Sequence, residues 1–113
     1  MKEGDIVKAA LNQSDGKLKF RLVLLLKRMP PFGDWLVCGI TSKLQNKVDQ
    51  FDVLLNEDDK YFKETGLVMT SLIRLGFLAV IGEKVIEGTI GYISSEIYTR
   101  LIKNLINHLE IKI

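Results

Sequence analysis

The sequence has only one cysteine and one histidine, and this shortage excludes several kinds of site. The lone cysteine, Cys38, cannot form an internal disulfide, which favours a cytoplasmic protein. One cysteine and one histidine also cannot form a zinc site. Residues 88–91 hold two glycines but lack the lysine and helix that follow a phosphate-binding loop. We therefore expect neither a metal nor a nucleotide cofactor.

Long apolar runs and a large net charge are missing as well. The apolar runs are far shorter than the roughly 20 residues that span a membrane, and the first residues lack the apolar segment of a secretory signal. We therefore expect a soluble protein with no membrane partner. Sixteen Lys and Arg against fourteen Asp and Glu give a formal charge of +2, too small to identify a nucleic-acid-binding protein by composition.

The distribution of the basic residues is more informative than their number. Lys17, Lys19 and Arg21 alternate along one stretch, and four further basic residues lie in or near loops that can lie beside it, namely Lys27, Arg28, Lys43 and Lys47. We predict a local basic surface from these residues. The alternative is that the lysines only solvate the faces of strands.

Short apolar runs between turn residues fill most of the chain, which we interpret as one domain over residues 1–113 with its own core. The predicted strands cover residues 5–11, 17–27, 34–41, 50–55, 67–81 and 84–86, with a bend at Gly76. A short helix is predicted over 57–63, capped by Asn56, and an amphipathic helix begins at Ser94 or Ser95. The apolar stripe of that helix is expected to pack in the core or in a dimer. The pattern predicts a mainly β fold with some α structure, a strongly bent antiparallel sheet or small barrel with a C-terminal helix.

Polar groups lie at the ends of two neighbouring predicted strands. Arg21 precedes an apolar run, and an arginine that opens a core strand normally meets a carboxylate, a carbonyl or a phosphate. The next strand ends in the hydroxyls of Thr41 and Ser42. Together these groups can hold a phosphate. The structural alternatives are that Arg21 pairs with Asp5 and that Thr41 satisfies a local backbone group.

The order of several short motifs resembles that of the MazF/PemK toxin family. These motifs are Gly4-Asp5-Ile6-Val7 opening a strand, a polar loop, Arg21 before an apolar strand, Ile40-Thr41-Ser42 ending the next, and Ser71-Leu72-Ile73-Arg74. Their order and spacing match over nearly the whole chain. The resemblance implies an SH3-like small barrel of antiparallel strands, usually a homodimer.

The same resemblance implies a function. Members of the family are typically metal-independent endoribonucleases that cleave single-stranded RNA such as mRNA at short sequences, inhibit growth and are silenced by a cognate antitoxin. DNA would be reached only indirectly, through the antitoxin complex. Arg21 stands at the catalytic arginine of the family and Thr41 at its catalytic threonine or serine. We expect Lys17, Lys19, Ser42 and Lys43 to bind RNA beside them.

The chain departs from the family pattern at two places. Leu22 replaces the usual proline after the arginine, and Met69-Thr70-Ser71 lacks an Arg and an Asp that some members carry there. These departures motivate an alternative function, a non-catalytic module of the same fold that binds an antitoxin peptide or a nucleic acid through the loop after Leu11. Arg74 lies inside an apolar run, so we predict that it forms a structural ion pair.

Aromatic side chains are the remaining candidates for RNA contact. Trp35, Phe32 and Tyr61 can stack on bases, although aromatics in strands and loops more often fill a core or an interface.

Overall fold

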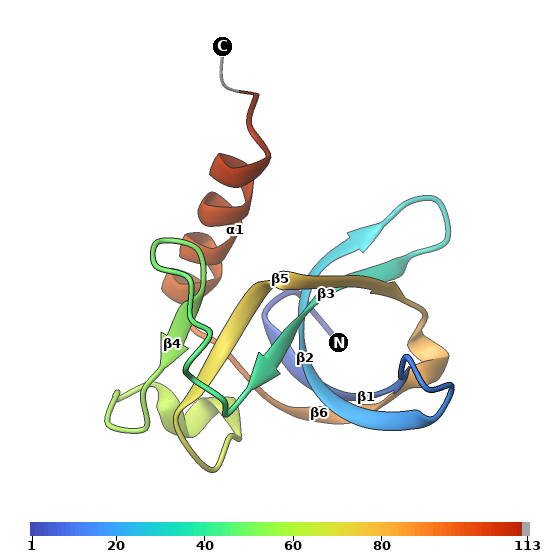
Figure 1. Cartoon of the computed structure of the whole chain (residues 1–113), viewed down its shortest axis with the longest axis horizontal. Helices are drawn as coiled ribbons and strands as arrows, with labels where there is room; N and C mark the ends of the chain where they lie inside the picture. Colours follow the sequence, from blue (N-terminus) through green and yellow to red (C-terminus); the bar gives the residue numbers. More distant parts are fainter. Residues whose placement is uncertain (112–113) are drawn as a thin grey trace.

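The computed structural model describes residues 1–111, which form a curled antiparallel sheet with one α-helix at the C-terminal end (Figure 1). The strands are β1 (Asp5–Asn12), β2 (Leu18–Met29), β3 (Asp34–Thr41), β4 (Val53–Leu55), β5 (Ser71–Ile81) and β6 (Ile86–Tyr92). Two 3₁₀ helices, η1 (Phe62–Thr65) and η2 (Glu83–Val85), and the helix α1 (Ser95–Leu109) complete the fold. The strand order is β4-β5-β3-β2-β1-β6, and every neighbouring pair is antiparallel. The predicted fold, mainly antiparallel β with a C-terminal helix, is confirmed.

The middle of the sheet is buried on both faces because successive residues of its strands alternate between two apolar clusters. The first core includes α1 and contains Ile6, Leu24, Leu26, Cys38, Val53, Leu55, Ile73, Leu75, Ile93, Leu101 and Leu105. The second core lies on the opposite faces of the same strands and contains Val7, Ala9, Val23, Leu25, Trp35, Val37 and Ile81. This double burial explains the nearly continuous apolar runs of the middle strands.

Two local predictions were wrong. The predicted helix over 57–63 is replaced by turns followed by η1, because the side chains of Asn56 and Asp59 accept hydrogen bonds from the backbone two residues ahead, at 2.9 and 3.0 Å. Such turns compete with helix formation. The predicted strand over 84–86 is mostly η2, and the strand that follows it, β6, was not predicted. Its side chains are largely exposed and it contains Gly88, so it lacks the apolar alternation of a core strand.

The predicted bend at Gly76 is confirmed by the register between β3 and β5. Cys38 lies opposite Leu78, whereas the next residue, Gly39, lies opposite Arg74. Residues 75–77 of β5 are therefore extra residues with no counterpart on β3. An insertion of this kind is a β-bulge, which bends a strand and redirects its side chains.

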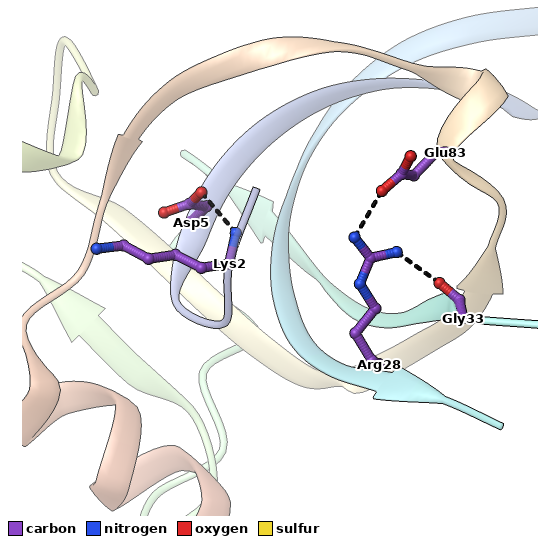
Figure 2. A network of polar contacts seen from close by, with 5 residues as sticks. All are labelled: Lys2, Asp5, Arg28, Gly33 and Glu83. Atoms are coloured by element: carbon purple, nitrogen blue, oxygen red, sulfur yellow. Dashed lines mark hydrogen bonds and ion pairs between the residues drawn. The ribbon is translucent and has the colours of Figure 1, made fainter.

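Arg28 connects the end of β2 to two other segments (Figure 2). Its guanidinium donates to the carbonyl oxygen of Gly33 at 2.7 Å and to Oε1 of Glu83 at 2.6 Å. The same group lies over the Trp35 ring, 4.3 Å from the ring centroid. Arg28 thus stabilises the far end of the β2–β3 hairpin, where planar stacking and paired donors suit arginine.

The edge strand β6 packs closely against η1. A Cβ atom at Gly66 would collide with the Ile90 carbonyl, and one at Gly91 would collide with the Thr65 backbone. Gly66 also has a φ of 73°, which favours glycine. The two glycines therefore allow the backbone of β6 to contact the backbone at the end of η1, at the edge of the sheet. Within residues 1–111, no helix is long and apolar enough to cross a membrane.

Candidate active site

One hollow of about 400 Å³ lies between the β1–β2 hairpin, the end of β3 and the bulged part of β5. Its lining includes Arg21, Thr41, Lys43 and Arg74. The fold therefore brings the two predicted catalytic residues and one predicted RNA-binding lysine to a single place.

The hollow opens where the pairing of β2 with β3 ends. Val23 lies opposite Gly39 in the last pair of this register. Arg21 lies two residues before Val23 and Thr41 lies two residues after Gly39, so both extend from this pair toward the hollow. Residues two apart share a face of a strand, so both follow the face of the second core. Leu11 lies at the corresponding end of β1. At this end of the sheet the apolar side chains of the second core give way to polar ones.

The Arg21 side chain does not pair with Asp5, so that structural alternative was wrong. Its Nη2 atom donates to Oε1 of Gln13 at 3.1 Å, and the Asp5 carboxylate instead accepts from the backbone N–H of Lys2 at 3.0 Å (Figure 2). An amide orients the guanidinium without neutralising it. The charge of Arg21 thus remains available to an anion in the hollow.

Thr41 accepts a hydrogen bond from the backbone N–H of Lys43 at 3.1 Å. This is the local backbone role considered as an alternative, and it leaves the hydroxyl proton of Thr41 free to donate to another group. The contact also holds Lys43 at the rim of the hollow. Ser42 is exposed beside Thr41 but does not line the hollow.

The prediction that Arg74 forms an ion pair was wrong. Among residues 1–111, its half-buried side chain forms no ion pair or hydrogen bond, and it lines the same hollow as Arg21. The other two arginines pair with carboxylates, Arg28 with Glu83 and Arg100 with Glu96. The described residues that line the hollow supply three cations, one of them Lys43, and no carboxylate or imidazole. Such a surface attracts anions.

Comparison with known proteins identifies the family. Residues 2–109 match the model of the PemK-like, MazF-like toxins of type II toxin-antitoxin systems. The chain belongs to this family. The resemblance inferred from the motifs is therefore confirmed, and it extends over nearly the whole sequence. Members of the family are endoribonucleases, which supports the toxin and nuclease part of the sequence-based prediction.

A solved structure has the same fold as this PemK-like, MazF-like toxin. The Mycobacterium tuberculosis toxin MazF-mt6 superposes with a TM-score of 0.70 at 21% identity, over 96% of this chain and 99% of the other. No match was found among curated proteins.

The remaining predicted RNA-binding residues of this toxin lie outside the hollow. Lys17 is exposed in the turn between β1 and β2, and Lys19 is exposed on β2 opposite Leu11. Lys19 and Arg21 are two residues apart on β2, so Lys19 extends the same face of the strand. Their role in RNA binding stays a prediction.

The sequence analysis missed Gln13 and Phe77, which also line the hollow. Gln13 belongs to the loop after Leu11 that the alternative function singled out. Arg74 directly precedes the bulge and Phe77 is its last residue, and both side chains line the hollow. Gly76, a glycine inside an apolar strand, was the sequence signal that indicated the bulge.

The three cations of the hollow suit electrostatic interactions with an anion. In the described part of the chain, no three His, Cys, Asp or Glu side chains form a metal-binding group. The only thiol, Cys38, is buried in the first core, where burial and then the nearby charge of Asp52 raise its pKa to about 12. Its thiolate is therefore not available as a nucleophile. The hollow can bind a phosphate and stabilise added negative charge on it.

Proposed function

We propose that this toxin is a metal-independent endoribonuclease that cleaves single-stranded RNA, chiefly mRNA, at short sequences. The observation that carries the proposal is the convergence of Arg21, Thr41 and Lys43 on a hollow lined without carboxylates. Family membership supplies the toxin class. The hollow supplies cations and a hydroxyl that can bind the phosphate of a phosphodiester.

In the proposed reaction, the ribose 2′-oxygen attacks the adjacent phosphorus and the 5′-oxygen leaves. The 2′-hydroxyl loses its proton to solvent hydroxide, and the departing oxygen gains one from water. The products are a 2′,3′-cyclic phosphate and a 5′-hydroxyl. Arg21 offers two parallel donors to the phosphate oxygens, whose charge grows in the transition state. Thr41 donates its free hydroxyl proton to the same phosphate and orients it.

Residues around the hollow are assigned to the rest of the RNA chain. Lys43 and Ser42 lie next to Thr41, and Lys19 and Lys17 continue from Arg21 toward the tip of the hairpin. We assign these side chains to phosphates on either side of the cleaved bond. Their cations would make binding dependent on salt.

Further parts of the proposal concern partners and location. We propose a homodimer that acts in the cytoplasm, inhibits growth and is neutralised by a cognate antitoxin. DNA would be bound only through the toxin-antitoxin complex.

The test is digestion of a long single-stranded RNA in the presence of a chelator, with the fragment ends mapped. Arg21→Ala is the active-site variant, and Arg100→Ala is the matched control because Arg100 forms only an exposed pair with Glu96 on α1. Discrete cuts by the wild type and by Arg100→Ala, but not by folded Arg21→Ala, support the proposal. Cleavage by folded Arg21→Ala at the rate of the wild type contradicts the assignment.

A second candidate function is a non-catalytic binding module. The absence of a carboxylate or imidazole in the described lining of the hollow favours it, because proton transfer then relies on solvent. RNA or antitoxin binding without any cleavage by the folded wild type would favour this function.

A further inference from the structure

The bulge in β5 is a fixed feature of the fold. Because residues 75–77 have no partners on β3, the backbone N–H of Leu75 needs another acceptor. It donates to Oδ1 of Asp52 at 3.1 Å, and the other oxygen of this buried carboxylate accepts from the N–H of Val48 at 2.9 Å. A charged, buried acceptor thus holds the bulge in place.

The bulge places two unused side chains in the hollow. Arg74 precedes it, half-buried and without an ion pair or hydrogen bond to any of residues 1–111. Phe77 is the last residue of the bulge, and 43% of its surface is exposed. A partly buried guanidinium without a partner is costly, and an exposed ring at the wall of a cationic hollow gains from being covered.

The position of the Phe77 ring is defined by its packing against Gly39. The ring lies over Gly39, where an added Cβ would come within 3.1 Å of Cδ1 of Phe77. Trp35, which the sequence analysis considered for stacking on a base, is buried beneath Arg28 and unavailable to RNA. Phe77 is thus the aromatic side chain that both lines the hollow and exposes its ring there.

We propose that Arg74 and Phe77 form a second nucleotide subsite, which holds the RNA residue next to the cleaved bond. Arg74 binds the neighbouring phosphate, and Phe77 stacks on the base. Stacking of this kind tolerates all four bases. The subsite therefore contributes affinity for RNA and positioning of the chain rather than selectivity for one base. This inference rests on the proposed function, because it places the subsite beside Arg21 and Thr41.

A single-stranded oligonucleotide pool with 2′-fluoro ribose tests the subsite directly. This probe lacks the attacking hydroxyl, so its dissociation constant is measured without cleavage. We expect Phe77→Ala to weaken binding by roughly 5- to 100-fold and Phe77→Trp to restore it. Arg74→Gln should weaken binding and lower the slope of log affinity against log salt by about 0.7, whereas Arg74→Lys should keep that slope.

Matched controls separate the subsite from a loss of fold. Tyr92→Ala removes an aromatic side chain that is 46% exposed on β6 and does not line the hollow, and Arg100→Gln removes a cation from α1. Both should bind the probe as the wild type does. With cleavable RNA, Arg74→Gln and Phe77→Ala should raise KM more than they lower kcat.

The outcomes also separate the subsite from the proposed function. If Phe77→Ala and Arg74→Gln bind the probe as tightly as the controls, or if they lower kcat with KM unchanged, the subsite is wrong. If the wild type binds the probe and these variants do not, but neither the wild type nor any variant cleaves RNA, the subsite stands and the proposed nuclease fails. A folded wild type that does not bind the probe overturns both.

Discussion

The guanidinium of Arg21 is oriented by the neutral amide of Gln13, which leaves its charge for a ligand. Thr41 is similarly oriented by a contact that uses its oxygen as an acceptor and spares its proton. At the scale of single residues, both side chains are positioned by their neighbours and still have a donor to offer. This arrangement makes their contributions separable by substitution.

Replacement of Arg21 should reduce cleavage in two steps. Arg21→Lys keeps a positive charge but loses the paired donors, whereas Arg21→Ala loses both. We expect Arg21→Ala to lower kcat by about 100- to 1,000-fold, with Arg21→Lys between it and the wild type. Single-turnover cleavage measures this order, and an Arg21→Lys variant as fast as the wild type would exclude a role for the fork geometry.

Replacement of Thr41 tests the hydroxyl alone. Thr41→Ser retains the donor, while Thr41→Val keeps the shape and removes it. We expect Thr41→Ser to stay within about tenfold of wild-type kcat and Thr41→Val to lose at least about tenfold more, the cost of one hydrogen bond to a charged group. A Thr41→Val variant as active as Thr41→Ser would contradict the role given to the hydroxyl.

The pH dependence of cleavage follows from which side chains the hollow lacks. In the proposed reaction solvent hydroxide removes the 2′ proton, since the described lining of the hollow has no carboxylate or imidazole. We expect the rate to rise about tenfold per pH unit between about pH 5 and 8. A bell-shaped profile would contradict this expectation and show that an acid or base from elsewhere, such as a second subunit, takes part.

At the scale of elements, the contact between β6 and η1 limits what the sheet edge tolerates. Gly91 meets the Thr65 backbone, whereas a Cβ at Gly88 in the same strand would meet nothing within 4 Å. The two glycines therefore form a matched pair for substitution.

We expect Gly91→Ala to lower the free energy of unfolding by about 1 to 3 kcal/mol, because the new methyl group overpacks against backbone that cannot move away. Gly88→Ala should change it by less than about 1 kcal/mol. Urea unfolding of both variants provides the comparison. Equal midpoints would mean that β6 can shift away from η1.

The helix and strands differ in how well the sequence predicted them. The helix α1 was predictable because Ser94 accepts from the Ile97 N–H at its start and Leu101 and Leu105 repeat at helical spacing. Arg21 and Thr41 were predictable as a pair because antiparallel neighbours bring such strand ends together. The lack of an ion pair at Arg74 was not predictable. It depends on which carboxylates lie near this side chain in space, and the bulge in β5 decides this rather than distance along the sequence.

At the scale of the whole molecule, the apolar stripe of α1 divides into two parts. Leu101 and Leu105 are buried in the first core, whereas Ile106 and Leu109 remain 57% and 68% exposed. We therefore expect a homodimer at micromolar concentration, since exposed apolar side chains in a row are a common basis of association. Sedimentation equilibrium gives the mass, and a monomer at that concentration would contradict the expectation.

The buried Trp35 gives this toxin an optical signal of its own. It is the sole indole of the chain, it is 1% exposed in the second core, and the Arg28 guanidinium lies over its ring. Its fluorescence therefore follows the folding of the sheet without any added label, while Arg28 and Trp35 do not line the hollow. A variant that loses RNA binding and keeps the emission maximum of the wild type has lost a contact surface, whereas a red-shifted maximum reveals an unfolded chain.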